Sequence, residues 1–249
     1  MYIIKNISCV IIVKNAATTI EATLESLKSF EDVVLYDNGS TDSTIEISKN
    51  YSNINLIQGK FSGFGPTKNR AATFAKNEWI LSLDADETVS TSLIEELKNL
   101  KLDNVKEVFI LKRDNYFLNK EVKHGGWGND YLTRIYNRTF HNFNQNIVHE
   151  FVELKNDTIK ISLKSSFKHN AVQDINSFLY KIASYSDLAS KNKKTCCFLT
   201  VFLKANWAFF KTYFLQLGIL DGWRGFFIAS TNAYSKFFRY TKRYINCKK

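Results

Sequence analysis

The feature that most constrains the fold of this chain is the alternation of apolar, strand-like runs with helix-like segments in its first 90 residues. Ile7–Val13 is β-branched and apolar almost throughout, as expected of a strand buried on both faces. Runs at Asp32–Asp37, Ile54–Gln58 and from Trp79 follow, separated by segments with helical spacing of apolar residues. This alternation predicts an α/β fold with a parallel, doubly wound sheet flanked by helices.

Acidic residues end two of these strands. Asp37 ends the second strand, and the fourth runs into Asp84, Ala85 and Asp86. Because parallel sheets bind ligands beyond the carboxyl ends of their strands, we expect the three carboxylates to face one crevice. Asp84 and Asp86 suit Mg²⁺ or Mn²⁺, which favours a few carboxylates together with substrate phosphates. The alternative is that Glu87 and its neighbours form the acidic first turn of a helix.

The third helix, expected to start at Pro66, carries Lys68 and Arg70 in its first turns. Cationic side chains and free backbone N–H groups there favour an anion, although a solvated first turn is the alternative for Lys68. The sequence contains neither the G-x-G-x-x-G nor the G-x-x-x-x-G-K signature. We therefore expect a nucleotide to be held by carboxylates and a metal ion rather than by a glycine-rich loop.

Basic and aromatic residues are concentrated in the last third of the chain. Residues 174–249 contain 13 Lys and Arg against 3 Asp, which accounts for the whole net charge of +10. They also hold 18 of the 36 aromatic residues, in two stripes with helical spacing. We predict a catalytic domain at 1–170 and a helical, basic extension at 171–249. The stripes are interpreted either as a helical core or as a surface for an anionic membrane.

The termini and cysteines indicate a cytoplasmic protein. Cys196 and Cys197 are adjacent and lack metal-ligand spacing, which indicates neither a disulfide framework nor a zinc site. Ile3–Val13 is interrupted by Lys5 and Asn6, unlike a secretion signal. Together with the basic extension, this predicts a peripheral location on the inner face of the cytoplasmic membrane.

The chain resembles the family 2 glycosyltransferases, which have the GT-A fold. The resemblance is carried by S-C-V-I-I-V-K-N from Ser8, V-L-Y-D-N-G-S-T-D from Val34, K-N-R-A-A from Lys68 and L-D-A-D-E from Leu83. It implies a Rossmann-like, mostly parallel sheet and an inverting, metal-dependent hexosyltransferase that uses a UDP-sugar. It further implies that Asp37 contacts the base of the nucleotide, Asp84 lies near the ribose and Asp86 ligates the metal.

Beyond this region the chain is similar to the lipopolysaccharide core biosynthesis glycosyltransferases of Gram-negative bacteria. Trp127–Arg138, Val148–Glu150 and Phe214–Phe226 carry this similarity. It implies transfer of a sugar, which we expect to be glucose from UDP-glucose, to a lipopolysaccharide core or another lipid-linked glycan.

An inverting transfer needs a base that takes the proton of the acceptor hydroxyl. Glu150, beside His149, is the first candidate, because in related enzymes the base often follows the strand predicted at Tyr131–Arg138. Asp130 is the second candidate. Trp127, among three glycines, is interpreted either as a stacking platform for a sugar or as a ring that anchors a turn.

Two other functions are consistent with parts of the sequence. A sugar nucleotidyltransferase would have a similar sheet, but Lys14–Thr19 is not the glycine-rich, arginine-containing loop that this reaction uses. A non-catalytic protein could dock nucleic acid or membrane through the basic extension, but it would leave Asp37, Asp84 and Asp86 without a role. We therefore expect no nucleic-acid partner.

Overall fold

The computed structural model describes residues 3–147, 149–190 and 197–248, and it divides into two compact units. The first unit comprises Met1–Arg113 and Tyr131–His169, and the second comprises Asp114–Asp130 and Asn170–Lys249. The second unit therefore includes a segment, Asp114–Asp130, that we had placed in the catalytic domain. The domain boundary at residue 170 stays a prediction.

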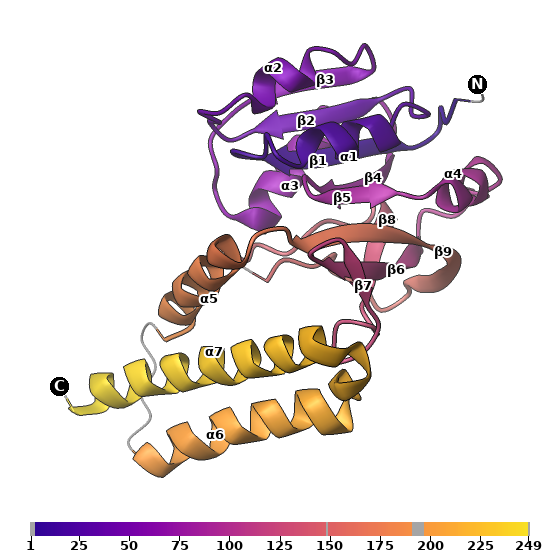
Figure 1. Ribbon diagram of the computed structural model, residues 1–249. Coiled ribbons are helices and arrows are strands. Elements are labelled where there is room, and N and C mark those ends of the chain that lie inside the picture. Colours follow the sequence, from indigo (N-terminus) through magenta and orange to yellow (C-terminus); the bar gives the residue numbers. More distant parts are fainter. Residues whose placement is uncertain (1–2, 148, 191–196, 249) are drawn as a thin grey trace. The chain divides into compact units, whose positions relative to one another are not determined.

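The first unit is built on a mixed sheet whose strands lie in the order β3-β2-β1-β4-β8-β6-β9-β5 (Figure 1). The first four strands of this order run parallel, and β8 pairs antiparallel with β4. The predicted α/β fold, with a mostly parallel Rossmann-like part, is confirmed. The strand bounds are β1 Ser8–Val13, β2 Val33–Asp37, β3 Ile54–Gln58, β4 Trp79–Asp84, β5 Glu87–Val89, β6 Glu107–Phe117, β8 Tyr131–Asn137 and β9 Ile159–Val172.

Four helices belong to this unit: α1 Ile20–Ser26, α2 Thr44–Ser48, α3 Phe64–Ala72 and α4 Thr91–Lys98. Helix α3 begins two residues before Pro66, at Phe64. Glu87 lies on strand β5, so its interpretation as part of a helical first turn is wrong. The helix that follows starts later, where the Ser90 hydroxyl accepts a hydrogen bond from the Leu93 N–H.

Side chains of β1 alternate between two hydrophobic cores. Cys9, Ile11 and Val13 pack into one cluster, and Val10 and Ile12 pack into the other. Each cluster covers one face of the sheet, since successive strand residues point to opposite faces. This explains why the sequence of β1 is continuously apolar rather than alternating.

A close approach of two backbones fixes the start of α3. A Cβ added to Gly65 would lie 1.9 Å from the carbonyl oxygen of Asn144. Alanine normally stabilises a helix relative to glycine by about 1 kcal/mol. At this position we expect Gly65→Ala to destabilise the fold by about 1–3 kcal/mol, because overpacking moves the backbone. Urea unfolding tests this, and a stabilised variant would show that the two segments separate freely.

The second unit is mainly helical. Strand β7, Lys120–Val122, pairs with the end of β6, and the helices are α5 Ile175–Ser190, α6 Phe198–Phe210 and α7 Gly222–Lys248. A π-helical turn η1, Lys211–Leu215, and a 3-10 turn η2, Gly218–Asp221, join α6 to α7. Asp174 caps α5, because its carboxylate accepts a hydrogen bond of 2.7 Å from the Ser177 N–H. The predicted helical extension is therefore confirmed.

Two expectations about this extension change. Of the residues with helical spacing on α6, Phe198 and Phe202 are exposed, whereas Ala205 is buried, so this stripe forms a helical core only in part. Cys247 is disulfide-bonded, which the cysteine pattern did not indicate. None of the described helices is both long enough and apolar enough to cross a bilayer.

Candidate active site

The site forms where β4 ends and the chain turns back into β5. Glu87, on β5, is completely buried, and its carboxylate accepts a 3.0 Å hydrogen bond from the Asp84 N–H. This contact ties the two acidic residues of the turn together and leaves Asp86 between them. The carboxyl end of a central parallel strand thus presents carboxylates, as the sequence predicted.

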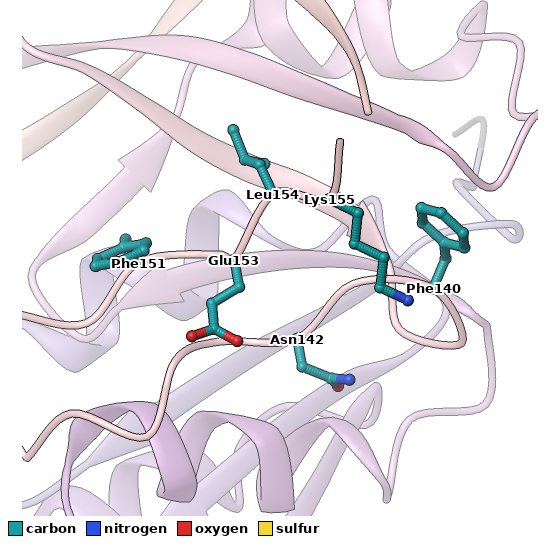
Figure 2. A pocket seen from close by; sticks show the side chains of 6 residues that line it. All are labelled: Phe140, Asn142, Phe151, Glu153, Leu154 and Lys155. Atoms are coloured by element: carbon teal, nitrogen blue, oxygen red, sulfur yellow. The ribbon is translucent and has the colours of Figure 1, made fainter. Parts of the chain in front are cut away.

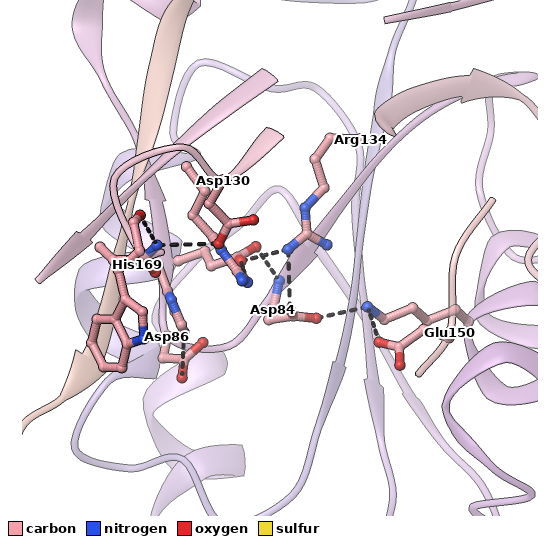
Figure 3. Close-up of polar contacts among 11 residues, drawn as sticks. Asp84, Asp86, Asp130, Arg134, Glu150 and His169 are labelled. Atoms are coloured by element: carbon pink, nitrogen blue, oxygen red, sulfur yellow. Dashed lines mark hydrogen bonds and ion pairs between the residues drawn. The ribbon is translucent and has the colours of Figure 1, made fainter. Parts of the chain in front are cut away.

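Lys68 links two of the predicted site residues. Its Nζ lies 2.8 Å from Asp84 Oδ1 and 3.0 Å from Glu150 Oε1 (Figure 3). The side chain is 3% exposed and extends from α3 into the site, with the ring of Phe143 5.2 Å from the ammonium group. The solvated alternative for Lys68 is therefore wrong. Lys68 instead joins the end of β4 to the loop after β8.

Two arginines, from strands β8 and β6, complete the charge network around Asp84 and Glu87. Arg134, on β8, is 5% exposed and donates hydrogen bonds to Asp84 Oδ2, at 3.2 Å, and to the Glu87 carboxylate. Arg113, on β6, lies 3.3 Å from the same oxygen of Glu87. The buried Arg134 guanidinium thus pairs with both carboxylates at the end of β4 and the start of β5. Neither Glu87 nor Arg113 had been identified as part of the site.

The network separates the acidities of its carboxylates. Burial alone would raise the pKa of Asp84, but the adjacent Lys68 and Arg134 outweigh it and hold that pKa well below its usual range. For Glu87 burial prevails and raises the pKa, although Arg134 opposes the shift. Asp84 is therefore a firmly ionised group.

Asp86 lies apart from these cations and beside a histidine. Its Oδ2 is 3.6 Å from Nε2 of His169, and the two side chains are 28% and 18% exposed. His169 is brought here by β9, where it pairs with Glu87 of β5. It lies more than 80 residues from Asp86, and no motif spacing connects the two. The sequence therefore gave no reason to identify it.

Asp86 and His169 fit a divalent cation better than Asp84 does. A carboxylate and an imidazole are both ligands for Mn²⁺, whereas Asp84 is already paired with Lys68 and Arg134. No group of three or more His, Cys, Asp or Glu residues arranged for a metal occurs among the residues that the structure describes. A cation here would therefore need to complete its shell with substrate oxygens and water.

The other three predicted residues belong to other parts of the chain. Asp37 is completely buried, and its carboxylate accepts hydrogen bonds from the Gly39 N–H and from the N–H and hydroxyl of Ser40. Arg70 is exposed on α3 and belongs to none of the described ion pairs of the site. Asp130 belongs to the second unit, where it accepts a 3.1 Å hydrogen bond from Asn115.

The ring of Trp127 packs within the second unit. Its centroid lies 6.4 Å from that of Phe117 and 6.2 Å from that of Phe178. The backbone oxygen of Trp127 also accepts a 2.9 Å hydrogen bond from Asn115. Of the two interpretations left open, these contacts favour a ring that anchors a turn over a free stacking platform.

A separate hollow of about 360 Å³ opens beside the loop that follows β8 (Figure 2). An isolated antiparallel bridge pairs Phe143 with Val152 in this loop. The hollow includes neither Glu150 nor any of the other predicted site residues. Its lining combines two aromatic rings with an amide, a carboxylate and an ammonium group, from Phe140, Phe151, Asn142, Glu153 and Lys155, and it also includes Leu154.

A parallel α/β sheet with an acidic site at its carboxyl end, followed by antiparallel strands, is the GT-A architecture of glycosyltransferases. The family model described as "Glycosyl transferase family 2" matches residues 8–167, which is well over half of the chain. The chain belongs to this family. The match ends close to the start of the helical extension.

Relatives of the chain include glycosyltransferases from several species of Rickettsia. One from Rickettsia bellii, described as an uncharacterized glycosyltransferase, is 28% identical over 262 residues and covers 96% of this chain and 86% of that protein. A cholesterol galactosyltransferase of Borreliella burgdorferi is 28% identical over 127 residues, covering 47% of this chain and 35% of that protein. Solved structures include residues 1–349 of S. aureus TarS with UDP-GlcNAc, at 14% identity and a TM-score of 0.47, covering 98% and 91% of the two chains.

Proposed function

We propose that this chain is a metal-dependent, inverting hexosyltransferase that moves a sugar from a UDP-sugar to a lipid-linked glycan. The donor we propose is UDP-glucose and the acceptor a lipopolysaccharide core. The observation that carries the proposal is the ion-paired bridge from Asp84 through Lys68 to Glu150, in a chain of glycosyltransferase family 2. The bridge joins the acidic strand end to a carboxylate that can act as a base.

In the proposed reaction, Glu150 takes the proton of the acceptor hydroxyl while its oxygen attacks the anomeric carbon. The bond from that carbon to the diphosphate breaks on the opposite side, so the configuration inverts. Lys68 fixes the position of the Glu150 carboxylate through the 3.0 Å contact. Asp130 remains the second candidate for the base.

The donor would be held by the other predicted residues. Asp86 and His169 would bind Mg²⁺ or Mn²⁺, whose charge offsets that of the departing diphosphate. Asp37 would contact the base, Asp84 the ribose, and Arg70 the phosphates. For Asp37 this requires the turn at Gly39 and Ser40 to share or release its carboxylate.

The proposed acceptor and location are supported by the second unit and by one relative. Its exposed aromatic and basic residues support a peripheral position at an anionic membrane surface, on the inner face of the cytoplasmic membrane. The Borreliella relative, named a cholesterol galactosyltransferase, is a case in which the named acceptor is a lipid. A lipid-linked acceptor, and no nucleic acid, is therefore proposed.

Calorimetric titration of UDP-sugars, with and without Mn²⁺, tests the donor and the metal together. We expect one UDP-sugar to bind only with Mn²⁺, and Asp86→Ala to abolish this binding. Asp157→Ala removes a surface carboxylate paired with Lys106 and is the matched control, which should bind normally. If no nucleotide sugar binds with or without the metal, the enzyme function is wrong and a non-catalytic docking protein takes its place.

A further inference from the structure

Helix α6 presents an apolar ridge to solvent. Leu199, Leu203, Trp207, Phe210 and Phe214 recur at helical spacing through α6 and η1, and each is between 45% and 59% exposed. We call these five residues the α6 ridge. Soluble proteins rarely leave such a contiguous apolar surface uncovered unless it contacts a membrane or another protein.

The opposite side of α6 packs against α7 along most of its length. Ring pairs fix this packing near both ends, with centroids 5.6 Å apart for Phe198 and Tyr244 and 5.7 Å apart for Phe209 and Phe226. Three residues beyond Phe209, the Thr212 hydroxyl accepts a 3.3 Å hydrogen bond from the Asn232 side chain. The two helices therefore run antiparallel as one element of the second unit.

Five cations gather along this helix pair. Lys204 and Lys211 lie two turns apart on the α6 side, and Lys236, Arg239 and Arg243 follow at helical spacing on α7. We call them the basic cluster. The pKa of Lys236 is lowered, first by burial and then by the neighbouring Arg239, Arg243, Lys204 and Lys211, so all five act on one region.

Four members of the basic cluster lack a carboxylate partner among the residues that the structure describes. The sequences of α6, η1 and α7 contain no Asp or Glu. Lys204, Lys211, Lys236 and Arg239 form no ion pair with a carboxylate of the described residues. Nε of Arg239 is also buried without a hydrogen-bond partner there. Crowded cations of this kind favour an anion as ligand.

We propose that the α6–α7 pair docks on a lipid bilayer, with the α6 ridge in the interface and the basic cluster holding the phosphate of an anionic lipid headgroup. This rests on the proposed function only for the identity of the acceptor, since it defines where a lipid-linked substrate would be presented. A second copy of the chain is a poorer partner, because it would place one basic cluster against another.

The test is cosedimentation of the full chain with phosphatidylcholine vesicles, with and without phosphatidylglycerol. We expect Lys204→Gln, Lys211→Gln, Lys236→Gln and Arg239→Gln together to weaken binding to the anionic vesicles by about 100-fold or more. Replacing Leu203, Trp207 and Phe210 with Ser should weaken binding to both kinds of vesicle by at least about tenfold. Circular dichroism and urea unfolding establish that both variants fold.

A matched control removes the same charge from exposed lysines of the first unit. Lys49→Gln, Lys76→Gln, Lys101→Gln and Lys160→Gln together should change vesicle binding less than about threefold. An equal loss of vesicle binding in this control would show that net charge alone explains the effect. That result would overturn the proposed lipid site. Displacement by inorganic phosphate at constant ionic strength would identify a free phosphate site instead of a lipid site, and tighter binding to a single-stranded oligonucleotide would also overturn the proposal.

Donor binding separates this proposal from the proposed function. UDP-sugar titration without vesicles should be unchanged in the basic-cluster variant, because its residues lie outside the first unit. Wild-type vesicle binding without UDP-sugar binding would support the docking surface and remove the enzyme function. UDP-sugar binding by a wild-type chain that does not bind vesicles would support the enzyme function and overturn the docking surface.

Discussion

Replacing Glu150 with Gln is expected to lower the rate of sugar transfer by a factor of about 10²–10⁴ while leaving UDP-sugar binding nearly unchanged. The amide keeps the size of the side chain but cannot take the proton of the acceptor hydroxyl. Lys68 retains its 2.8 Å contact with Asp84, so the site should stay assembled. Steady-state transfer and calorimetric donor binding, measured side by side, test this.

The matched control is Glu153→Gln, three residues further along the same loop and exposed. It should transfer sugar at close to the wild-type rate. If Glu150→Gln retains activity and Asp130→Asn loses it, Asp130 is the base and the role of Glu150 is confined to pairing with Lys68. Loss of donor binding in Glu150→Gln would show that the substitution disassembles the site.

Replacing Lys68 with Met is expected to destabilise the protein by about 3 kcal/mol, because it leaves partly buried carboxylates without their cation. Asp84 keeps Arg134, but Glu150, 20% exposed, loses the described ion pair that connects it to α3. The expected loss in the free energy of unfolding is kept at this value because both carboxylates remain partly exposed, and solvent screens their charges. Urea unfolding at neutral pH measures it.

Lys106→Met is the matched control, since it removes a lysine that pairs with Asp157 at the surface. An exposed pair of this kind contributes at most about 1 kcal/mol. Adding Glu150→Gln to Lys68→Met should recover part of the stability, because it removes the unpaired charge. If Lys68→Met is no more destabilising than the control, the prediction is wrong, and water solvates the two carboxylates as well as the ammonium group does.

The pH dependence of stability should also differ between these two variants. Because the pKa of Asp84 is depressed in the folded state, its contribution is present above its ordinary pKa and is lost as the pH falls below that value. Lys68→Met removes one of the two cations that depress it. The variant should therefore lose less stability than wild type between neutral and acidic pH, whereas Lys106→Met should follow the wild type.

The sequence by itself determined the parallel part of the fold, because that part depends on local patterns. Continuous apolar runs such as Ile7–Val13 can be satisfied only by a strand covered on both faces, and the helices between them close parallel connections. The position of the acidic residues at the end of β4 was also predictable, because parallel sheets bind ligands beyond the carboxyl ends of their strands. The motifs near Lys68 and Leu83 were sufficient to indicate the family that the comparison with its model established.

Only the tertiary structure decided which charges meet. Lys68, Asp84 and Glu150 lie on a helix, a strand end and a distant loop, so no spacing in the sequence could show that one ammonium group joins them. His169 reaches Asp86 through the pairing of β5 with β9, a long-range contact. The same holds for the second unit, where helical spacing predicted the stripes, but exposure depends on which neighbours pack against each side of α6.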